Sequence, residues 1–447
     1  MELHFDWIDK FILFVLFTLN ILFFYLYAKD AKRIGFWFLP SSLILFSYVL
    51  NYILKPILLL FPPIEAEKIF VYFPYSTQEF IFALFYSTLF FITFVCSSIF
   101  FNRKLPRNIS TIFRHNIANS VDIEKLNNLL SFISILSYLY LLNTEGIYGF
   151  NTGYQKGFMD IILSISATFA YPCFFIALLL FKLNKHKSQI LVLICLTSIV
   201  FIDSIFSTSK APILLLLFLY LLYADIVKIK INRWVIAGAV PLILIMFFYS
   251  YFSRYYSDTS SSISLSLVTN NLEQMMNNLD LFYNLVFPSM FNRFELFDNL
   301  IYVTMRVDVL DKGYFTFGSV VELFNLIPRF LWSSRPYLYF DYYVGIDILG
   351  NYSSSASAGR VGEAYFVFGR LGFLMGIPYA YISYKAVKML KNKITLAKVF
   401  FFVFLYIHYF AHDDYLFQGT NLIFFAVIIF YSLLWSYRFL QIFFKKA

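Results

Sequence analysis

The stretch SSSASAGRVGEAYFVFGRLG, Ser353 to Gly372, contains the features around which the rest of the chain is organised. A serine-rich segment leads into Arg360 and Glu363, which open an apolar aromatic segment that ends near Arg370. In a helix that begins near Gly359, Arg360 and Glu363 share a face. Arg370 returns to the face of Glu363 seven residues later, about 10 Å further along the axis.

Glycines recur along the same segment. Gly362, Gly369 and Gly376 are seven residues apart, and Gly372 lies four residues before Gly376. Such a stripe lets a second helix approach closely, so we expect this helix to be packed inside a bundle, with its charges facing a cavity. The simpler alternative is a Glu–Arg pair that caps an ordinary transmembrane helix. Ionisable residues inside a membrane are functional by default, which favours the first interpretation.

The composition places the chain in a membrane. Of its 447 residues, 60% are hydrophobic and 22% aromatic, and its mean hydropathy of +0.72 is far above that of soluble proteins. The net charge of +9 comes from basic residues in short loops between apolar runs, a pattern that reflects topology and does not indicate nucleic-acid binding. The three cysteines all lie in apolar runs, which argues against a disulfide framework or a cysteine metal site.

Apolar runs long enough to cross a bilayer number about eleven, within a range of about 10 to 12. They lie at roughly 8–28, 36–61, 80–101, 126–145, 158–181, 188–207, 211–225, 234–252, 364–387, 395–412 and 420–440. The seventh is short, and Lys55 and Pro56 interrupt the second. The predicted fold class is therefore an all-α polytopic membrane protein.

Positive residues set the predicted orientation. Most of the 35 Lys and Arg residues lie in loops on one side of the eleven-helix arrangement. Because basic loops stay in the cytoplasm, the N-terminus is predicted outside and the C-terminus inside. The chain then divides into helices 1–8 over residues 1–252, a large external loop over 253–363 and helices 9–11 over 364–447.

The large external loop is predicted to form a lid. Its apolar segments, Leu281 to Val309 and Tyr314 to Trp332, are interrupted by charges and prolines and are too broken to span a bilayer. We expect amphipathic or re-entrant helices on the outer surface. Six of the loop's seven basic residues are arginine. Arginine suits bidentate contacts to phosphate or carboxylate, although pairing with the loop's own acidic residues is equally open.

Ionisable residues within the predicted spans lie mostly near the outer ends. They are Lys55, Asp203, Lys210, Arg370, His408 and His412, with Asp413 and Asp414 directly after. A transport pathway needs polar groups through the whole thickness, whereas chemistry at the outer leaflet needs them only at one side. The pattern favours an enzyme or binder that acts on a lipid-anchored headgroup. The His408–His412 spacing could suit a metal, but such outer residues commonly just meet the interface, and no metal is predicted.

Three short motifs resemble one family. IPRFLWSSRP (327–336), GRVGEAYFVFGRLG (359–372) and FNRFELFDNL (291–300) are similar to motifs of the oligosaccharide repeat-unit polymerases, the Wzy-type O-antigen and capsule polymerases. Where that family has a Gly-Ser-Arg-Gly turn, this chain has Thr208, Ser209, Lys210 and Ala211, which keeps the charge but not the arginine. The resemblance covers mainly residues 200–375.

The resemblance implies a multi-spanning, GT-C-like glycosyltransferase at the outer face of the cytoplasmic (inner) membrane. Its donor and acceptor would be oligosaccharides on undecaprenyl diphosphate, and no cofactor is implied. A chain-length regulator and a flippase would be its partners.

Residue roles follow from combining this reaction with the charged positions. Arg360 and Glu363 are the catalytic candidates, with Glu363 as the base. Lys210, Arg293, Arg329 and Arg335 are the candidates for binding diphosphate. Glu295, Arg370, His408 and His412 are held in reserve.

Three other functions remain open, and one of them, a cell-wall polymerase of the shape and division type, fits by architecture but lacks the expected residue pattern. An O-antigen ligase has similar architecture, but its external loop usually contains a histidine, and residues 253–363 contain none. A flippase for lipid-linked oligosaccharides is a transporter, and it would place polar residues through the full depth.

Overall fold

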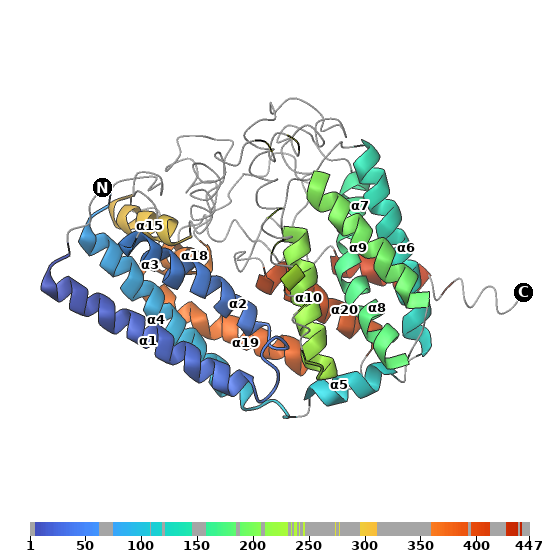
Figure 1. Cartoon of the computed structure of the whole chain (residues 1–447), viewed down its shortest axis with the longest axis horizontal. Coiled ribbons are helices and arrows are strands. Elements are labelled where there is room, and N and C mark those ends of the chain that lie inside the picture. Colours follow the sequence, from blue (N-terminus) through green and yellow to red (C-terminus); the bar gives the residue numbers. More distant parts are fainter. Residues whose placement is uncertain are drawn as a thin grey trace, which may run out of the picture.

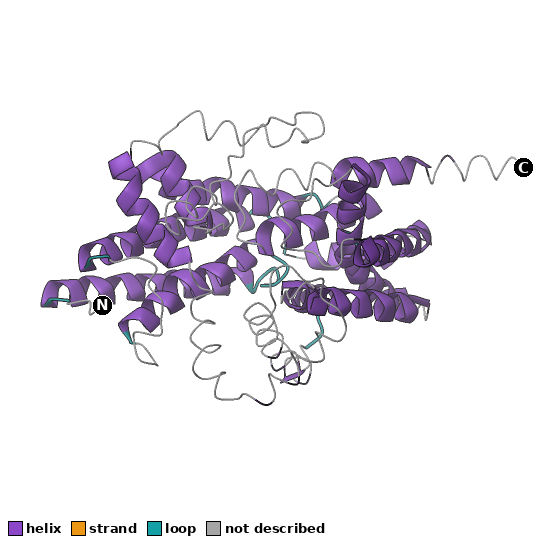
Figure 2. Ribbon diagram, turned by 90° about the horizontal axis from the view of Figure 1, so that it is seen from above, coloured by secondary structure: helices purple, strands orange, loops and turns teal. Residues whose placement is uncertain are grey.

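A computed structural model gives the architecture of the protein. It describes residues 5–61, 75–107, 109–118, 121–144, 158–184, 188–206, 211–230, 296–310, 359–391, 395–411 and 426–436, together with the single positions 234, 237, 238, 241, 245, 273, 277 and 439. Within these ranges the regular structure is helical and contains no strand (Figure 2). The prediction of an all-α protein is confirmed for this part of the chain.

The described helices form two groups that lie side by side (Figure 1). The first group consists of α1 (Trp7–Ala31), α2 (Ser41–Tyr48), α3 (Lys55–Leu60), α4 (Thr77–Asn102), α15 (Leu296–Leu310), α18 (Gly359–Phe368) and α19 (Gly376–Lys388). The second consists of α5 (Ile109–Ala118), α6 (Val121–Thr144), α7 (Phe158–Thr168), α8 (Ala170–Asn184), α9 (Ser188–Phe206), α10 (Ala211–Val227) and α20 (Leu396–Leu405). Segments far apart in sequence thus share one group, since α15, α18 and α19 pack with α1–α4.

Five helical stretches are long and apolar enough to cross a membrane. They are Trp7–Ala31, Ser41–Leu60, Thr77–Asn102, Ile162–Leu183 and Gly359–Lys388. Several further described helices are apolar but shorter, among them the predicted short span, which forms α10. The structure is therefore consistent with a helical membrane protein.

Polar residues define where two of the long helices begin. Asp6 caps α1, where its carboxylate accepts the backbone N–H of Asp9 at 2.7 Å. Ser76 caps α4, where its hydroxyl accepts the backbone N–H of Glu79 at 3.3 Å and its own N–H donates to the Glu79 carboxylate. These reciprocal capping boxes satisfy N–H groups that a helix start leaves without a partner.

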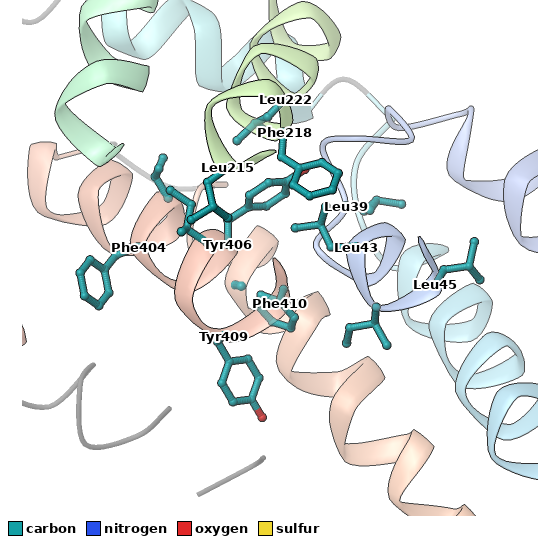
Figure 3. Packing of buried hydrophobic residues seen from close by; sticks show 14 of the residues in the cluster. Leu39, Leu43, Leu45, Leu215, Phe218, Leu222, Phe404, Tyr406, Tyr409 and Phe410 are labelled. Carbon is teal, nitrogen blue, oxygen red and sulfur yellow. The ribbon is translucent and has the colours of Figure 1, made fainter. Parts of the chain in front are cut away.

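An aromatic core joins the two groups. Leu39 and Leu43 from the first group face Phe218 of α10 and Tyr406, the first residue of the π-helical turn η5 (Tyr406–Ala411) (Figure 3). The Tyr406 hydroxyl donates to the backbone oxygen of Trp37 at 2.7 Å. Asp225 of α10 accepts the backbone N–H groups of Trp37 and Phe38 at 2.5 and 3.2 Å. The turn before α2 is thereby tied to the second group by hydrogen bonds as well as by apolar packing.

The segment from Gly359 to Lys388 is not one straight helix. α18 ends at Phe368, Gly369 has a φ of +58°, and a 3₁₀ segment, η4 (Gly369–Met375), leads into α19. Because the α-helical register stops at Gly369, the expectation that Arg370 shares a face with Glu363 is wrong. Arg370 is exposed, whereas Glu363 is buried.

The expected close approach of a second helix is confirmed at Gly376. A Cβ atom there would lie 2.7 Å from the backbone nitrogen of Phe94 and 3.0 Å from the backbone oxygen of Phe90, both in α4. Contacts below 3.0 Å require backbone movement, so α19 packs against α4 at a distance that only glycine allows.

Gly376→Ala is expected to destabilise the fold. Forcing α19 away from α4 should cost about 1–3 kcal/mol, in the range of an overpacked core. The measurement is thermal unfolding of the purified protein in detergent, with Gly238→Ala as the matched control because a Cβ at Gly238 would meet nothing within 4 Å. Equal melting temperatures for the two variants would contradict the tight packing.

The position of α15 differs from the one predicted for the external loop. The first two turns of α15, Leu296 to Val303, are buried on every side. An amphipathic helix lying on the outer surface would expose one face, so that alternative is wrong for this part of α15, whereas the re-entrant alternative stays a prediction. Asp298, one of the charges that interrupt this apolar segment, pairs with Lys55 inside the protein. α15 packs against α4, α18 and the π-helical turn η1 (Val49–Leu54).

Candidate functional site

Arg360 and Glu363 lie together in the interior of the first group. Gly359 opens α18 with a φ of +61°, and Arg360 and Glu363 follow on the first turn with exposed fractions of 1% and 5%. Charged side chains are seldom so deeply buried unless they are paired and hydrogen-bonded. The prediction that this helix is packed inside a bundle is confirmed, and the cavity that its charges were expected to face stays a prediction.

Two tyrosines surround the Arg360 guanidinium. It donates to the backbone oxygen of Tyr409 and lies 5.4 Å from the ring centre of Tyr379 and 5.7 Å from that of Tyr409. A cation over an aromatic face is stabilised by the ring quadrupole, more strongly where water is excluded. The Tyr409 carbonyl belongs to the π-helical turn η5, and π-helical turns are frequent at functional sites.

Glu363 is oriented by one of the same tyrosines. The Tyr379 hydroxyl donates to Glu363 Oε2 at 3.1 Å. Tyr379 therefore contacts both charged residues of α18, one through its hydroxyl group and one through its ring. The result is a compact cluster of Arg360, Glu363, Tyr379 and Tyr409, which we call the Arg–Glu cluster. It combines a fixed cation, a carboxylate and a hydroxyl donor in an environment of low dielectric constant.

A second buried ion pair lies in the same helix group. Lys55 Nζ is 3.0 Å from Asp298 Oδ2, and both side chains have an exposed fraction of 0%. Burial raises the pKa of Asp298, against the opposing effect of the Lys55 charge. Because neither charge can be buried alone at low cost, each side chain needs the other as its partner.

α15 connects the two charged sites. It provides Asp298 to the ion pair and packs along α18, which carries Arg360 and Glu363. Figure 1 shows α15 and α18 side by side at one end of the first group. On the other side of α18, the ring of Tyr365 stands edge-on to Tyr86 with centroids 4.9 Å apart. α18 thus packs along α15 and contacts α4 through the ring of Tyr365.

The structure brings together only some of the residues predicted from sequence. Arg360 and Glu363 are both buried and both contact Tyr379, while Arg370 lies at the surface beyond the helix break. His408 lies in the π-helical turn η5. The remaining candidates lie outside the described residues: Lys210, Arg293, Glu295, Arg329, Arg335 and His412. Among the residues whose side chains are described, no three His, Cys, Asp or Glu groups come together as a ligand set for a metal ion.

Sequence reasoning missed the roles of four residues of these sites. Asp298 counted only as an interruption of an apolar segment, and its partner Lys55 only as an outer-end charge. A single lysine and a single aspartate, each inside an apolar run, are natural partners because neither can be buried alone. No sequence signal distinguished Tyr379 and Tyr409 from the 35 tyrosines of the chain.

Comparison with known proteins gives no match, whether to a protein-family model, a curated protein or a solved structure. The fold and site define the chain as an all-helical protein with candidate membrane spans and buried charged clusters.

Proposed function

We propose that this protein is a membrane glycosyltransferase that joins oligosaccharide repeat units carried on undecaprenyl diphosphate into O-antigen, capsule or exopolysaccharide. It would span the cytoplasmic membrane about eleven times with its active site facing outward. The observation that carries the proposal is the buried Arg–Glu cluster at the start of α18. It lies within GRVGEAYFVFGRLG, the stretch that resembles the repeat-unit polymerases.

The chemistry of this reaction needs the groups that the cluster contains. A hydroxyl of the acceptor sugar attacks the anomeric carbon of the donor, and the bond from that carbon to the diphosphate oxygen breaks. The electron pair of the broken bond leaves with the lipid diphosphate. The hydroxyl proton passes to a base, and a glycosidic bond remains.

In this reaction Glu363 takes the proton of the acceptor hydroxyl and Arg360 stabilises the charge that develops on the leaving diphosphate. A fixed guanidinium in a site without water favours the transition state more than the ground state. Tyr379 holds the Glu363 carboxylate in place through its hydroxyl group. Lys210, Arg293, Arg329 and Arg335 are proposed as further diphosphate contacts.

The proposed reaction needs no cofactor, because cleavage of the sugar–diphosphate bond of the lipid-linked donor supplies the free energy for synthesis. A flippase would supply the repeat units to the outer face, and a chain-length regulator would control the product. Ligase and transporter functions are the alternatives that the test must separate.

The test is a strain in which the gene is deleted. Surface glycan is separated on a gel, and lipid-linked intermediates are extracted from the same cells. We expect the ladder of polymer lengths to disappear while single repeat units still reach the outer side. Polymer that accumulates on its lipid carrier would indicate a ligase, and repeat units retained on the cytoplasmic side would indicate a flippase. Either result would overturn the proposal.

A further inference from the structure

The Lys55–Asp298 ion pair has no role in the chemistry above. Its 3.0 Å contact lies in an aromatic enclosure. Phe297, adjacent to Asp298, stands edge-on to Phe80 with centroids 5.1 Å apart and to Tyr52 with centroids 6.5 Å apart. Every one of these side chains is buried. The pair is therefore cut off from water on all sides.

Stability alone does not account for such a pair. Removing two charges from water costs several kcal/mol per ion in proteins, and well-packed apolar residues in their place are often as stable or more stable. A buried pair does specify geometry, because any shift of one partner leaves both charges unpaired. Apolar contacts, by contrast, tolerate sliding and rotation.

The position of the pair indicates which geometry it specifies. Lys55 follows the π-helical turn η1, directly before Pro56, so its place on the α2–α3 segment is set by a local irregularity of the backbone. Asp298 lies in the first turn of α15. One charge is thus on a candidate membrane span, and the other is on a helix that is far away in sequence and packs along α18.

We propose that Lys55 and Asp298 are positioning residues: their ion pair sets the depth and rotation of α15 in the bundle, and α15 in turn sets the place of α18 with Arg360 and Glu363. The catalytic part of this inference rests on the proposed function. The structural part, the placement of α15, does not.

The test compares two double variants. Lys55→Glu/Asp298→Lys reverses the pair and keeps the attraction, whereas Lys55→Met/Asp298→Leu replaces the pair with apolar side chains. Both are made in a background in which Cys96, Cys173 and Cys195 are replaced by alanine and Ile301, a buried residue of α15, is replaced by cysteine. Thermal unfolding in detergent shows whether each variant is folded.

The placement of α15 is measured by the rate at which a water-soluble maleimide labels the thiol of Ile301→Cys. We expect slow labelling in the parent and in the reversed pair, and labelling at least about tenfold faster in the apolar pair at a similar melting temperature. Polymer formed per unit of protein should fall by about tenfold in the apolar pair and recover in the reversed pair. If the reversed pair does not restore slow labelling, the attraction between the two charges does not determine the placement of α15.

Two other outcomes would overturn the inference. If the apolar pair is folded and its thiol remains protected, the ion pair does not place α15. If the thiol becomes reactive but polymer formation is unchanged, α15 does not position α18. An unsubstituted protein that makes no polymer would refute the proposed function, while the labelling result would still decide the placement of α15.

Discussion

Replacing Arg360 with lysine is expected to lower polymer formation by about 100-fold, because the proposed reaction uses the planar guanidinium to stabilise the leaving diphosphate. Lysine keeps the positive charge. Its ammonium group, however, lacks the planar pair of parallel N–H groups with which a guanidinium can bind a phosphate while another N–H donates to the Tyr409 carbonyl. The measurement is polymer formed from lipid-linked repeat units by membranes that contain equal amounts of each protein. Arg360→Ala should be at least as impaired.

The matched control is Arg103→Lys, at the end of α4, where the arginine side chain is exposed. It should retain normal polymer formation, since an exposed Arg-to-Lys change removes no buried contact. Melting temperatures separate a catalytic loss from an unfolded protein, because Arg360 is itself buried. Normal polymer formation by folded Arg360→Lys would show that the residue is structural and would remove it from the proposed mechanism.

Replacing Glu363 with glutamine is expected to have the second large effect. Glutamine is nearly isosteric and its amide oxygen can still accept the Tyr379 hydroxyl, so the fold should be retained. It cannot take up a proton, and loss of a general base lowers rates by about 10²–10⁴-fold. We expect kcat to fall by at least about 100-fold, while KM for the lipid-linked repeat unit changes little.

Glu79→Gln provides the corresponding control. Glu79 completes the capping box at the start of α4, and glutamine is accepted at that position of the motif. Its polymer formation should equal that of the unchanged protein. If Glu363→Gln were fully active, the base would have to be sought elsewhere, with Glu295 as the first alternative.

Local sequence features predicted the elements of the fold well. The apolar runs produced helices wherever the structure describes them, and the interruption at Lys55 and Pro56 appears as the π-helical turn η1 followed by α3. The spacing of Arg360 and Glu363 correctly placed both on the inward side of a helix that begins at Gly359. Each of these predictions depends on residues a few positions apart.

Predictions that assumed continuous helices were less successful. Arg370 was placed with Glu363 by extending an ideal helix through Gly369, and the positive φ at that glycine ended the register. Side chains repeat their direction about every 3.6 residues only while the backbone stays α-helical. A glycine can adopt a φ near +60° at little cost and so end the helix. α15 was assigned to a surface lid because charges and prolines interrupt its apolar segment, and the structure instead buries Asp298 against Lys55.

By itself, the sequence determined that the described part of the chain is helical with membrane-spanning character and that Arg360 and Glu363 share a helix face. These properties follow from hydropathy and from helix period, both of which are local. Only the tertiary structure decided that Asp298 pairs with Lys55, that Tyr379 and Tyr409 enclose Arg360, and that α15 is buried beside α18. The reason is physical: the partner of a buried charge is chosen by three-dimensional packing, and residues 55 and 298 are brought together by contacts that no local pattern encodes.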